Sequence, residues 1–533
     1  LEKYDTFAIW LDKDNTNVSI CANDECIYQA KDPYLLSDPR IKKIGCDLKE
    51  TKFFLADKKI NLAGIYFDIM VAEYLINSSG RDFSLSTLIW NNLGVIKDES
   101  KLQSFQKANL IFKLKPILEK KLNEMHLSDL FFKLEMPLVS VLADMELNGI
   151  KVDVRFLNNL NKKIEERLRD LIKQIYQESK EEFNINSPKQ LSVILFEKLK
   201  LPVIKKTKTG FSTDEEVLVT LAKTHDLPKL ILEYRQLAKL KSTYIDGLLP
   251  LVDKDNKLHT TFLQTGTETG RLSSSNPNLQ NIPIKTDLGR EIRRAFIASK
   301  DYILSSDYSQ IELRILAHLS EDKNLIKAFK DNQDVHKTTA ASIFGIDEIS
   351  VTDKMRETAK RINFGIIYGM SQFGLAKDLD ITYEEAQSFI DTYFLRYPKV
   401  KDYIEKQIKL ARTQGFVTTI LNRRRYLPGI LSKNNSIRML SERQAVNTSI
   451  QGSAADLIKL AMLNVDQELK NKNLHSRMIL QVHDELVFDV VKNELDEIKK
   501  IVREKMENVI KLEVPVKVKI SIGENWLELK EVV

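Results

Sequence analysis

The sequence predicts a multidomain protein that joins an α/β domain to a larger α+β part, and three observations support this. The chain has 533 residues, several times the usual length of one domain, so we expect about three or four units. Hydrophobic residues make up 43% and charged residues 29%, which is the balance of a soluble protein with packed cores. No run of about 18 apolar residues occurs, so a membrane span is not expected.

Charge and cysteine content limit the class of protein further. The chain carries 81 basic and 75 acidic residues, a net charge of +6, which excludes a histone-like polycation but leaves room for a local basic surface. The three cysteines, Cys21, Cys26 and Cys46, are too few for a disulfide framework and favour a reducing compartment. The chain begins at Leu1 without an initiator methionine, and we expect it to be part of a longer protein.

The predicted secondary structure of the first half of the chain changes from mixed helix and strand to helix alone. Within 1–125, short β-branched runs at 17–20 and 64–67 alternate with helical stretches such as 110–125. From about residue 130 the pattern is helical, and 158–180 carries charges at the spacing of a long exposed helix. Residues 151–250 hold an excess of five positive charges. This excess leaves two interpretations open, a nucleic-acid contact or helices that simply face solvent.

Two carboxylates stand beside predicted strands in the second half. A short apolar strand at 302–306 leads to Asp307, and helical spacing of apolar residues follows it. Two further strand-like runs, 478–482 and 485–490, flank Asp484 and read as a hairpin. Carboxylates at such places can converge on a shared pair of Mg²⁺ ions for in-line phosphoryl displacement. Taken singly, each aspartate is more simply a helix cap or turn former.

A third element places cations and rings on one helix face. Arg356, Lys360, Phe364 and Tyr368 recur every four residues, so on a helix they form one stripe. The cations could grip a triphosphate while the rings stack on a base and sugar. Packing of an amphipathic helix would explain the rings but not the aligned cations.

A polar run completes the set. TGRLSS at 269–274 is followed by NPNLQN at 276–281. Amide and hydroxyl side chains beside one arginine suit hydrogen bonding in a minor groove, where the acceptors are similar for every base pair. By itself such a run is also an ordinary polar loop.

Together these motifs resemble those of the A-family DNA polymerases. TGRLSS…PNLQNIP, DYSQIELR, RxxxKxxxFGxxYG and QVHDE occur in the family's order, and the match extends over 130–533 and, more weakly, over 1–125. The resemblance implies a right-hand polymerase fold with an N-terminal RNase H-like, exonuclease-type domain, in a Klenow-type arrangement. By similarity the exonuclease-like domain is 1–125 and the polymerase domain 126–533. Within the latter, the thumb spans about 150–255, the palm about 256–312 and 447–533, and the fingers about 313–446.

The resemblance also implies roles for individual residues. Asp307, Asp484 and the backbone carbonyl of Tyr308 match metal ligands, and Glu485 matches an accessory acid. Lys360 matches the lysine that contacts the triphosphate and protonates the leaving pyrophosphate, so Asp307, Asp484 and Lys360 are the expected catalytic residues. The implied nucleotide contacts are Arg356, Lys360, Phe364, Tyr368, His336, Glu312 and Gln310. The implied DNA contacts or supports are Arg271, Asn278, Gln280, Asn281, Arg443, Asn447, Gln451 and His483.

At two of these positions the resemblance implies selectivity among nucleotides that differ in the sugar. Glu312 resembles a steric gate, a side chain that occupies the volume a ribose 2′-OH would need. Phe364 lacks the hydroxyl of the tyrosine found in some relatives, which implies poor acceptance of dideoxynucleotides.

The implied activity is template-directed DNA synthesis. Deoxynucleotides would be added to a primer 3′-OH with release of pyrophosphate, using two Mg²⁺ ions for which Mn²⁺ can substitute, in DNA replication and repair. The implied partners are primer–template DNA and dNTPs, with no membrane, for a monomer in the bacterial cytosol or nucleoid. We expect no 5′-nuclease domain within these residues.

The N-terminal domain departs from the family's 3′→5′ exonuclease pattern. That chemistry needs a DxE pair, a further aspartate and a late YxxxD. Trp10 stands where the first acid is expected, Thr51 stands at the second region, and 105–118 contains no acidic residue. We therefore expect a vestigial, exonuclease-deficient domain kept for structure. Nearby carboxylates leave a shifted exonuclease site as the alternative: Asp12, Asp47 and Glu50.

Two further alternatives remain for the whole chain. A single-subunit RNA polymerase shares the palm carboxylates and a similar fingers helix, but Glu312 together with Phe364 argues against it. A catalytically silent DNA-binding protein should have lost Asp307, Asp484 or Lys360, and all three are present.

Overall fold

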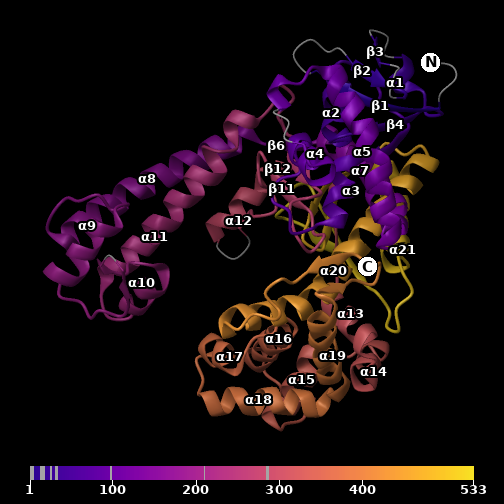
Figure 1. The fold of residues 1–533 in the computed structure, drawn as a ribbon. Coiled ribbons are helices and arrows are strands. Elements are labelled where there is room, and N and C mark those ends of the chain that lie inside the picture. The colour runs from indigo at the N-terminus through magenta and orange to yellow at the C-terminus, as the bar shows by residue number, and fades with distance from the viewer. Residues whose placement is uncertain are drawn as a thin grey trace.

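The structure is a computed structural model that describes residues 5–12, 18–23, 27–30, 34–95, 99–208, 210–283 and 287–532. These residues form an N-terminal α/β unit, a projecting helical arm, a central antiparallel sheet and a helical lobe (Figure 1). Among them, no helix combines the length and apolar character needed to cross a membrane.

The N-terminal unit is a five-stranded mixed sheet of order β3-β2-β1-β4-β5 with helices packed on it. Its strands are β1 Thr6–Leu11, β2 Val18–Cys21, β3 Ile27–Ala30, β4 Lys42–Gly45 and β5 Ile65–Asp68. Its helices are α1 Tyr34–Ser37, α2 Leu48–Asp57, α3 Ile69–Ile76, α4 Leu85–Leu93 and α5 Ser104–Glu124. β1 pairs antiparallel with β2 and parallel with β4. The strands predicted at 17–20 and 64–67 are present as β2 and β5, and the helix predicted at 110–125 lies in α5.

The helical arm projects from the rest of the molecule (Figure 1). It consists of α8 Val154–Ser179, α9 Pro188–Ser192, α10 Glu215–Leu221 and α11 Asp226–Leu240, with the short hairpin β7 Lys206–Thr207 and β8 Gly210–Phe211. α8 and α11 lie side by side and carry α9 and α10 at the far end, where Val217 and Ile231 belong to a separate hydrophobic core. The predicted exposed helix at 158–180 is confirmed, because only one stripe of α8 is buried.

Short elements join the N-terminal unit and the arm to the central sheet. They are α6 Ser128–Leu130, α7 Met136–Asn148, β6 Ile150–Val152, β9 Lys257–Leu258, β10 Thr261–Leu263, β11 Ser273–Ser275, α12 Asp287–Arg294 and β12 Phe296–Ile297. Brief 3₁₀ and π-helical turns connect the larger elements: η1 Glu99–Lys101, η2 Phe131–Glu135, η3 Val193–Lys198, η4 Lys241–Ile245, η5 Leu249–Leu251, η6 Glu348–Ser350 and η7 Lys492–Glu494.

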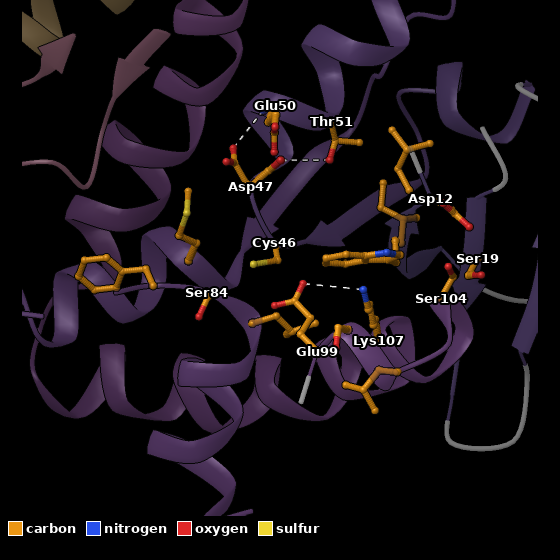
Figure 2. A pocket seen from close by; sticks show the side chains of 18 of the residues that line it. Asp12, Ser19, Cys46, Asp47, Glu50, Thr51, Ser84, Glu99, Ser104 and Lys107 are labelled. Carbon is orange, nitrogen blue, oxygen red and sulfur yellow. Dashed lines mark hydrogen bonds and ion pairs between the residues drawn. The ribbon is translucent and has the colours of Figure 1, made fainter. Parts of the chain in front are cut away.

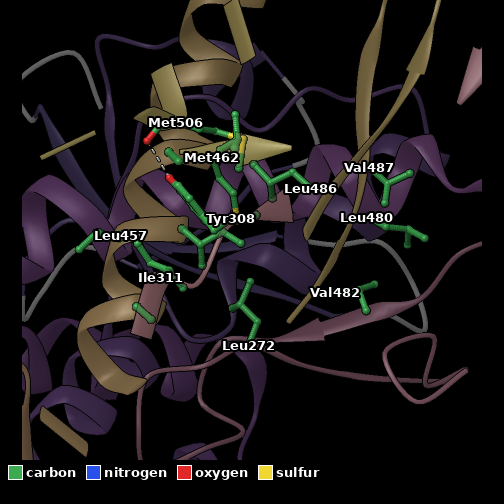
Figure 3. Packing of buried hydrophobic residues seen from close by; sticks show 14 of the residues in the cluster. Leu272, Tyr308, Ile311, Leu457, Met462, Leu480, Val482, Leu486, Val487 and Met506 are labelled. Carbon is green, nitrogen blue, oxygen red and sulfur yellow. Dashed lines mark hydrogen bonds between the residues drawn. The ribbon is translucent and has the colours of Figure 1, made fainter. Parts of the chain in front are cut away.

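The central sheet is antiparallel throughout, in the order β16-β17-β13-β18-β19. Its strands are β13 Tyr302–Tyr308, β16 Arg477–Val482, β17 Glu485–Val490, β18 Val518–Gly523 and β19 Lys530–Val532. Because β13 is the middle strand, residues 303–306 are buried in an unbroken run. Helices α20 Asn435–Asn471 and α21 Leu495–Glu507 pack against the sheet. Figure 3 shows Leu457 and Met462 of α20 beside Tyr308, whose hydroxyl donates a 3.0 Å hydrogen bond to the Met506 carbonyl.

The helical lobe follows β13 directly. It comprises α13 Ile311–Ser320, α14 Lys323–Lys330, α15 Val335–Phe344, α16 Asp353–Ile367, α17 Gln372–Leu379, α18 Tyr383–Arg396, α19 Pro398–Gln414 and the hairpin β14 Phe416–Thr418 with β15 Arg424–Tyr426. Its helix starts are defined by side-chain caps at Asp322, Asp334, Thr352, Ser371 and Thr382. The far end of the arm contacts the lobe through an ion pair of 2.9 Å between Glu216 of α10 and Lys377 of α17.

Candidate active site

Two carboxylates are brought together by the pairing of β13 with β17. Asp307 lies opposite Glu485 in the register of the two strands. Asp484 lies in the tight turn before β17, where His483 adopts a φ of 54°. The backbone N–H of Tyr308 donates a hydrogen bond of 3.2 Å to the Asp484 carbonyl. Backbone pairing therefore holds both aspartates at the same end of the sheet, as the sequence predicts; β13 runs two residues beyond the predicted strand, so Asp307 belongs to it.

The carboxylates share a region of concentrated negative charge. Asp307 is exposed, yet the surrounding protein removes part of its hydration. This desolvation, together with the charges of Glu485 and Asp484, raises the pKa of Asp307 to about 7. Burial also raises the pKa of Asp484, while Arg271 and His483 oppose that rise.

Glu485 differs from the two aspartates because it is anchored to the sheet. Its Oε1 accepts hydrogen bonds from the Ser305 hydroxyl at 2.6 Å and from the Trp526 indole N–H at 3.0 Å. The Arg293 guanidinium lies 4.2 Å from the centre of the Trp526 ring. These contacts fix the Glu485 side chain behind the aspartate pair.

The donor set fits a magnesium site, although it is not a closed cage. Among the described residues, no three or more His, Cys, Asp or Glu side chains gather into a group that could hold a metal ion. Two carboxylates and a backbone carbonyl are nevertheless the oxygen ligands that Mg²⁺ takes when substrate phosphates complete its shell. A bound cation would also offset the charge that raises the pKa of Asp307.

Helix α16 presents the predicted stripe on a partly exposed face. Arg356, Lys360 and Phe364 are partly exposed and Tyr368 is 37% exposed, whereas Asn363 on the other side is fully buried. The Phe364 and Tyr368 rings are stacked, with centroids 6.1 Å apart. Arg356 Nε donates to Asp334 Oδ2 at 2.6 Å, and Lys360 Nζ is 3.9 Å from a carboxylate oxygen of Glu357 on the same helix.

His336 lies beneath this stripe rather than on it. Its side chain is 2% exposed, and its Nδ1 accepts a 2.9 Å hydrogen bond from the Asn363 amide. Burial lowers the pKa of His336 to about 4, because the opposing charge of Asp334 does not make up for lost hydration. The neutral imidazole therefore joins α15 to α16, 5.8 Å from the Phe364 ring.

Glu312 connects three separate motifs. It lies in the first turn of α13 and is 4% exposed. Its Oε1 accepts a hydrogen bond from Arg271 Nη2 at 2.6 Å, and its Oε2 accepts one from the Tyr368 hydroxyl at 3.0 Å. Burial raises the pKa of Glu312 in spite of Arg271. Burial raises the pKa of Tyr368, and the Gln451 side chain of α20 partly opposes this rise.

The other predicted contacts surround this centre. Gln280 Nε2 donates to the backbone and side-chain oxygens of Gln481, at 3.2 and 3.0 Å, close to the aspartate turn. Arg443 packs against Gly369 at the end of α16. Gln310 precedes α13 with a φ of 54°.

The predicted DNA contacts differ in exposure. Those that are exposed are Asn278, Asn281, Arg443 and His483. The Asn447 amide oxygen is instead buried without a hydrogen-bond partner among the described residues.

A second site candidate is a cleft of about 1520 Å³ in the N-terminal unit. Trp10 of β1, Thr51 of α2 and Lys107 of α5 line it together, so the three segments that the sequence singles out do converge (Figure 2). The Lys107 ammonium lies 4.5 Å from the centre of a Trp10 ring and 3.8 Å from the Glu99 carboxylate. The Thr51 hydroxyl donates to the Asp47 carbonyl at 3.0 Å.

Comparison with known families decides the classification of the whole chain. Residues 154–528 match the model of DNA polymerase family A. The chain belongs to this family. Residues 4–99 match the ribonuclease H-like domain of DNA polymerase I. The predicted fold class, an A-family polymerase fold with an RNase H-like N-terminal domain, is thereby confirmed.

Relatives and a solved structure agree with this assignment. The chain is 48% identical to DNA polymerase I of Caldicellulosiruptor bescii over 493 residues, which cover 92% of this chain and 58% of the relative. It is 46% identical to DNA polymerase I of Lactococcus lactis over 528 residues, covering 95% and 60%. The chain thus spans about three fifths of the length of these curated relatives. It superposes with a TM-score of 0.92 on the POL domain of Pol1 from M. smegmatis in complex with DNA primer-template and dNTP, at 38% identity, covering 98% of this chain and 95% of that one.

Several side chains that complete the A-family site are absent from the sequence-based prediction. Asp334 both caps α15 and holds Arg356. Ser305 and Trp526 hold Glu485, and Asn363 holds His336. Asp334 could have been found from its position two residues before His336, where a cap is expected. The other partners are distant in sequence or lie on the buried side of a helix, and no local pattern marks them.

We expect the buried, neutral His336 to make stability depend on pH. Its folded pKa of about 4 lies below the unfolded value of 6.5, so the unfolded chain binds the extra proton and stability falls as pH drops through this window. Between pH 7 and 5 the loss attributable to His336 is about 2 kcal/mol. The free energy of unfolding should show this part of its pH dependence in wild type and should lack it in His336→Gln. The exposed His475→Gln serves as control, and equal pH profiles for wild type and His336→Gln would contradict the expectation.

Proposed function

We propose that this chain is a template-directed DNA polymerase that adds deoxynucleotides to a primer 3′-OH and releases pyrophosphate. The observation that carries the proposal is the placement of Asp307 and Asp484 at the same end of the central sheet. Glu312, on the helix that follows β13, accepts a hydrogen bond from Tyr368 at the end of α16. The relatives named DNA polymerase I and the neighbour bound to primer-template and dNTP support it.

Each group of the site has a proposed role. Asp307, Asp484 and the Tyr308 carbonyl would hold two Mg²⁺ ions, which supply charge stabilisation at the attacking and leaving oxygens. Arg356 and Lys360 orient the triphosphate along α16, and Lys360 holds the proton that the leaving pyrophosphate takes.

The remaining groups of the site shape the pocket for the base pair and sugar. Phe364 and Tyr368 present two stacked rings to the base and sugar. Glu312, buried and held from two sides, occupies the volume of a ribose 2′-OH.

We propose that the central sheet is the palm, the helical lobe the fingers and the helical arm the thumb. The arm's excess positive charge suits contact with the phosphate backbone of primer–template DNA. The expected DNA contacts, the monomeric state and the bacterial cytosolic location stay predictions.

We infer that the N-terminal unit no longer cuts DNA. Two-metal cleavage needs carboxylates that converge on cations. At this cleft, an indole ring takes the position of the first acid, and the helix α5 contributes the ammonium of Lys107, which repels cations. A shifted site built from Asp12, Asp47 and Glu50 is the alternative, and a mismatched primer distinguishes the two.

Primer extension tests the proposed activity. A 5′-labelled primer on a longer template should be extended with Mg²⁺ and dNTPs, and Asp484→Asn should lower the rate by about 10³-fold, because it removes several kcal/mol of transition-state stabilisation. Primer–template affinity should change little. The control is Asp496→Asn, an exposed carboxylate in the first turn of α21. A wild type without extension, or full activity in Asp484→Asn, would contradict the proposal.

A mismatched primer tests the loss of proofreading. With Mg²⁺ and no dNTPs, a 5′-labelled primer with a mispaired 3′ end should keep its full length. If wild type shortens the primer and Asp47→Asn or Glu50→Gln does not, a shifted exonuclease site cuts DNA and the inference is wrong.

Selection against ribonucleotides should depend on the volume of Glu312. Glu312→Ala should lower the ratio of deoxy- to ribonucleotide kcat/KM by roughly 10²-fold, because the pocket then accepts the 2′-OH. Glu312→Gln keeps the volume and should keep the discrimination. If Gln relaxes selection as much as Ala, then the charge of Glu312, and not its volume, sets the selectivity.

A further inference from the structure

The segment 267–271, which ends in Arg271, is enclosed on three sides although it belongs to no strand. Its Thr267 carbonyl accepts a 2.8 Å hydrogen bond from the Tyr74 hydroxyl of the N-terminal unit. A Cβ added to Gly452 of α20 would lie 3.0 Å from the Thr269 carbonyl. A Cβ added to Gly270 would lie 2.4 Å from Nε of Arg423 and 2.6 Å from its Cδ. The backbone of this segment therefore rests directly on the Arg423 side chain.

Arg423 is itself immobilised in a buried set of charges. Its side chain is 2% exposed; its Nε donates to Asp456 Oδ1 at 2.8 Å, and its Nη2 donates to Glu135. Lys459 Nζ donates to the same Glu135 oxygen at 2.8 Å. Two carboxylates thus balance two cations, so the group is neutral as a whole. Removal of any member would leave an uncompensated buried charge, which keeps Arg423 in one place.

The set joins three parts of the chain behind the active site. Glu135 ends the η2 turn, Arg423 precedes β15, and Asp456 and Lys459 lie on α20. The Thr419 hydroxyl donates to Asp456 Oδ2 at 2.5 Å and accepts from the Arg423 backbone N–H at 3.1 Å. Because these parts meet at Arg423, it offers a fixed surface against which the neighbouring loop can be placed.

We propose that Arg423 is a positioning residue for the active site. It fixes Gly270, and Gly270 in turn sets the direction of Arg271, whose guanidinium holds Glu312 at 2.6 Å. Glu312 then holds the Tyr368 hydroxyl at the end of α16. The requirement for glycine at 270 follows from the close approach of Arg423 and from a φ of +87°. The catalytic consequence of this arrangement rests on the proposed polymerase function.

Substitution of Gly270 tests the proposal without breaking the buried ion pairs. Gly270→Ala pushes the loop off Arg423 and should lower kcat for nucleotide addition at least tenfold. Gly415→Ala is the matched control, since Gly415 has a φ of +78° and nothing within 4 Å of an added Cβ. It carries the same backbone strain without the contact, and its kcat should stay within twofold of wild type.

A double-mutant cycle separates positioning from general damage. If Gly270→Ala acts through Arg271, it should have no further effect on kcat in an Arg271→Ala background. Multiplicative losses in the double variant would overturn the proposal. Should Gly270→Ala fail to fold, Gly452→Ala is the second variant, at a helical position where alanine favours the helix. Its added Cβ would lie 2.6 Å from the Thr419 methyl and 3.0 Å from the Thr269 carbonyl, so it presses on the segment from the other side, and the same cycle applies.

A readout without catalysis distinguishes failure of this proposal from failure of the proposed function. In thermal unfolding, the effects of Arg271→Ala and Glu312→Gln on the free energy of unfolding should be non-additive in the wild-type background and in the Gly415→Ala background. In the Gly270→Ala background the two effects should be additive. Coupling that survives in Gly270→Ala would overturn the positioning role. A wild type that extends no primer would refute the polymerase function, and this measurement would still decide the role of Arg423.

Discussion

The pairing of β13 with its two neighbours is the constraint on which the rest of the structure depends. β13 is the middle strand of the central sheet, so its backbone is hydrogen-bonded on both edges and residues 303–306 are buried. Asp307 is carried at the end of this rigid strand, and the Tyr308 N–H ties it to the turn that holds Asp484. A backbone contact between the strand and the turn, and not flexible side chains, therefore sets how the two aspartates lie relative to each other.

The parts of the site that lie outside the central sheet are connected to it through a few polar contacts. Glu312 begins the helix that leaves β13, and it is the place where the loop carrying Arg271 and the end of α16 meet. His336 and Asp334 then fix α15 against α16, so the stripe of Arg356, Lys360 and Phe364 is held from behind. The chemistry of the site is thus divided: the sheet positions acids, and the lobe positions cations and rings.

Much of this could be predicted because it is local in sequence. The strand, carboxylate and helix around Asp307, the hairpin around Asp484 and the four-residue spacing on α16 are patterns within short windows. The burial of His336 and the partners of Arg423 could not be predicted this way. Glu135 is 288 residues from Arg423 and 324 from Lys459, and a charged residue in a sequence carries no mark that it is buried with a distant counter-charge.

The cleft of the N-terminal unit could not become a cation-binding site through one substitution at Trp10. The Lys107 ammonium lies over the Trp10 ring and also pairs with Glu99. A carboxylate placed at position 10 would meet this ammonium and form an ion pair, so that substitution alone would not create a cation-binding site. Under the proposed loss of exonuclease activity, a cation site in this cleft would need changes on β1, α2 and α5 together.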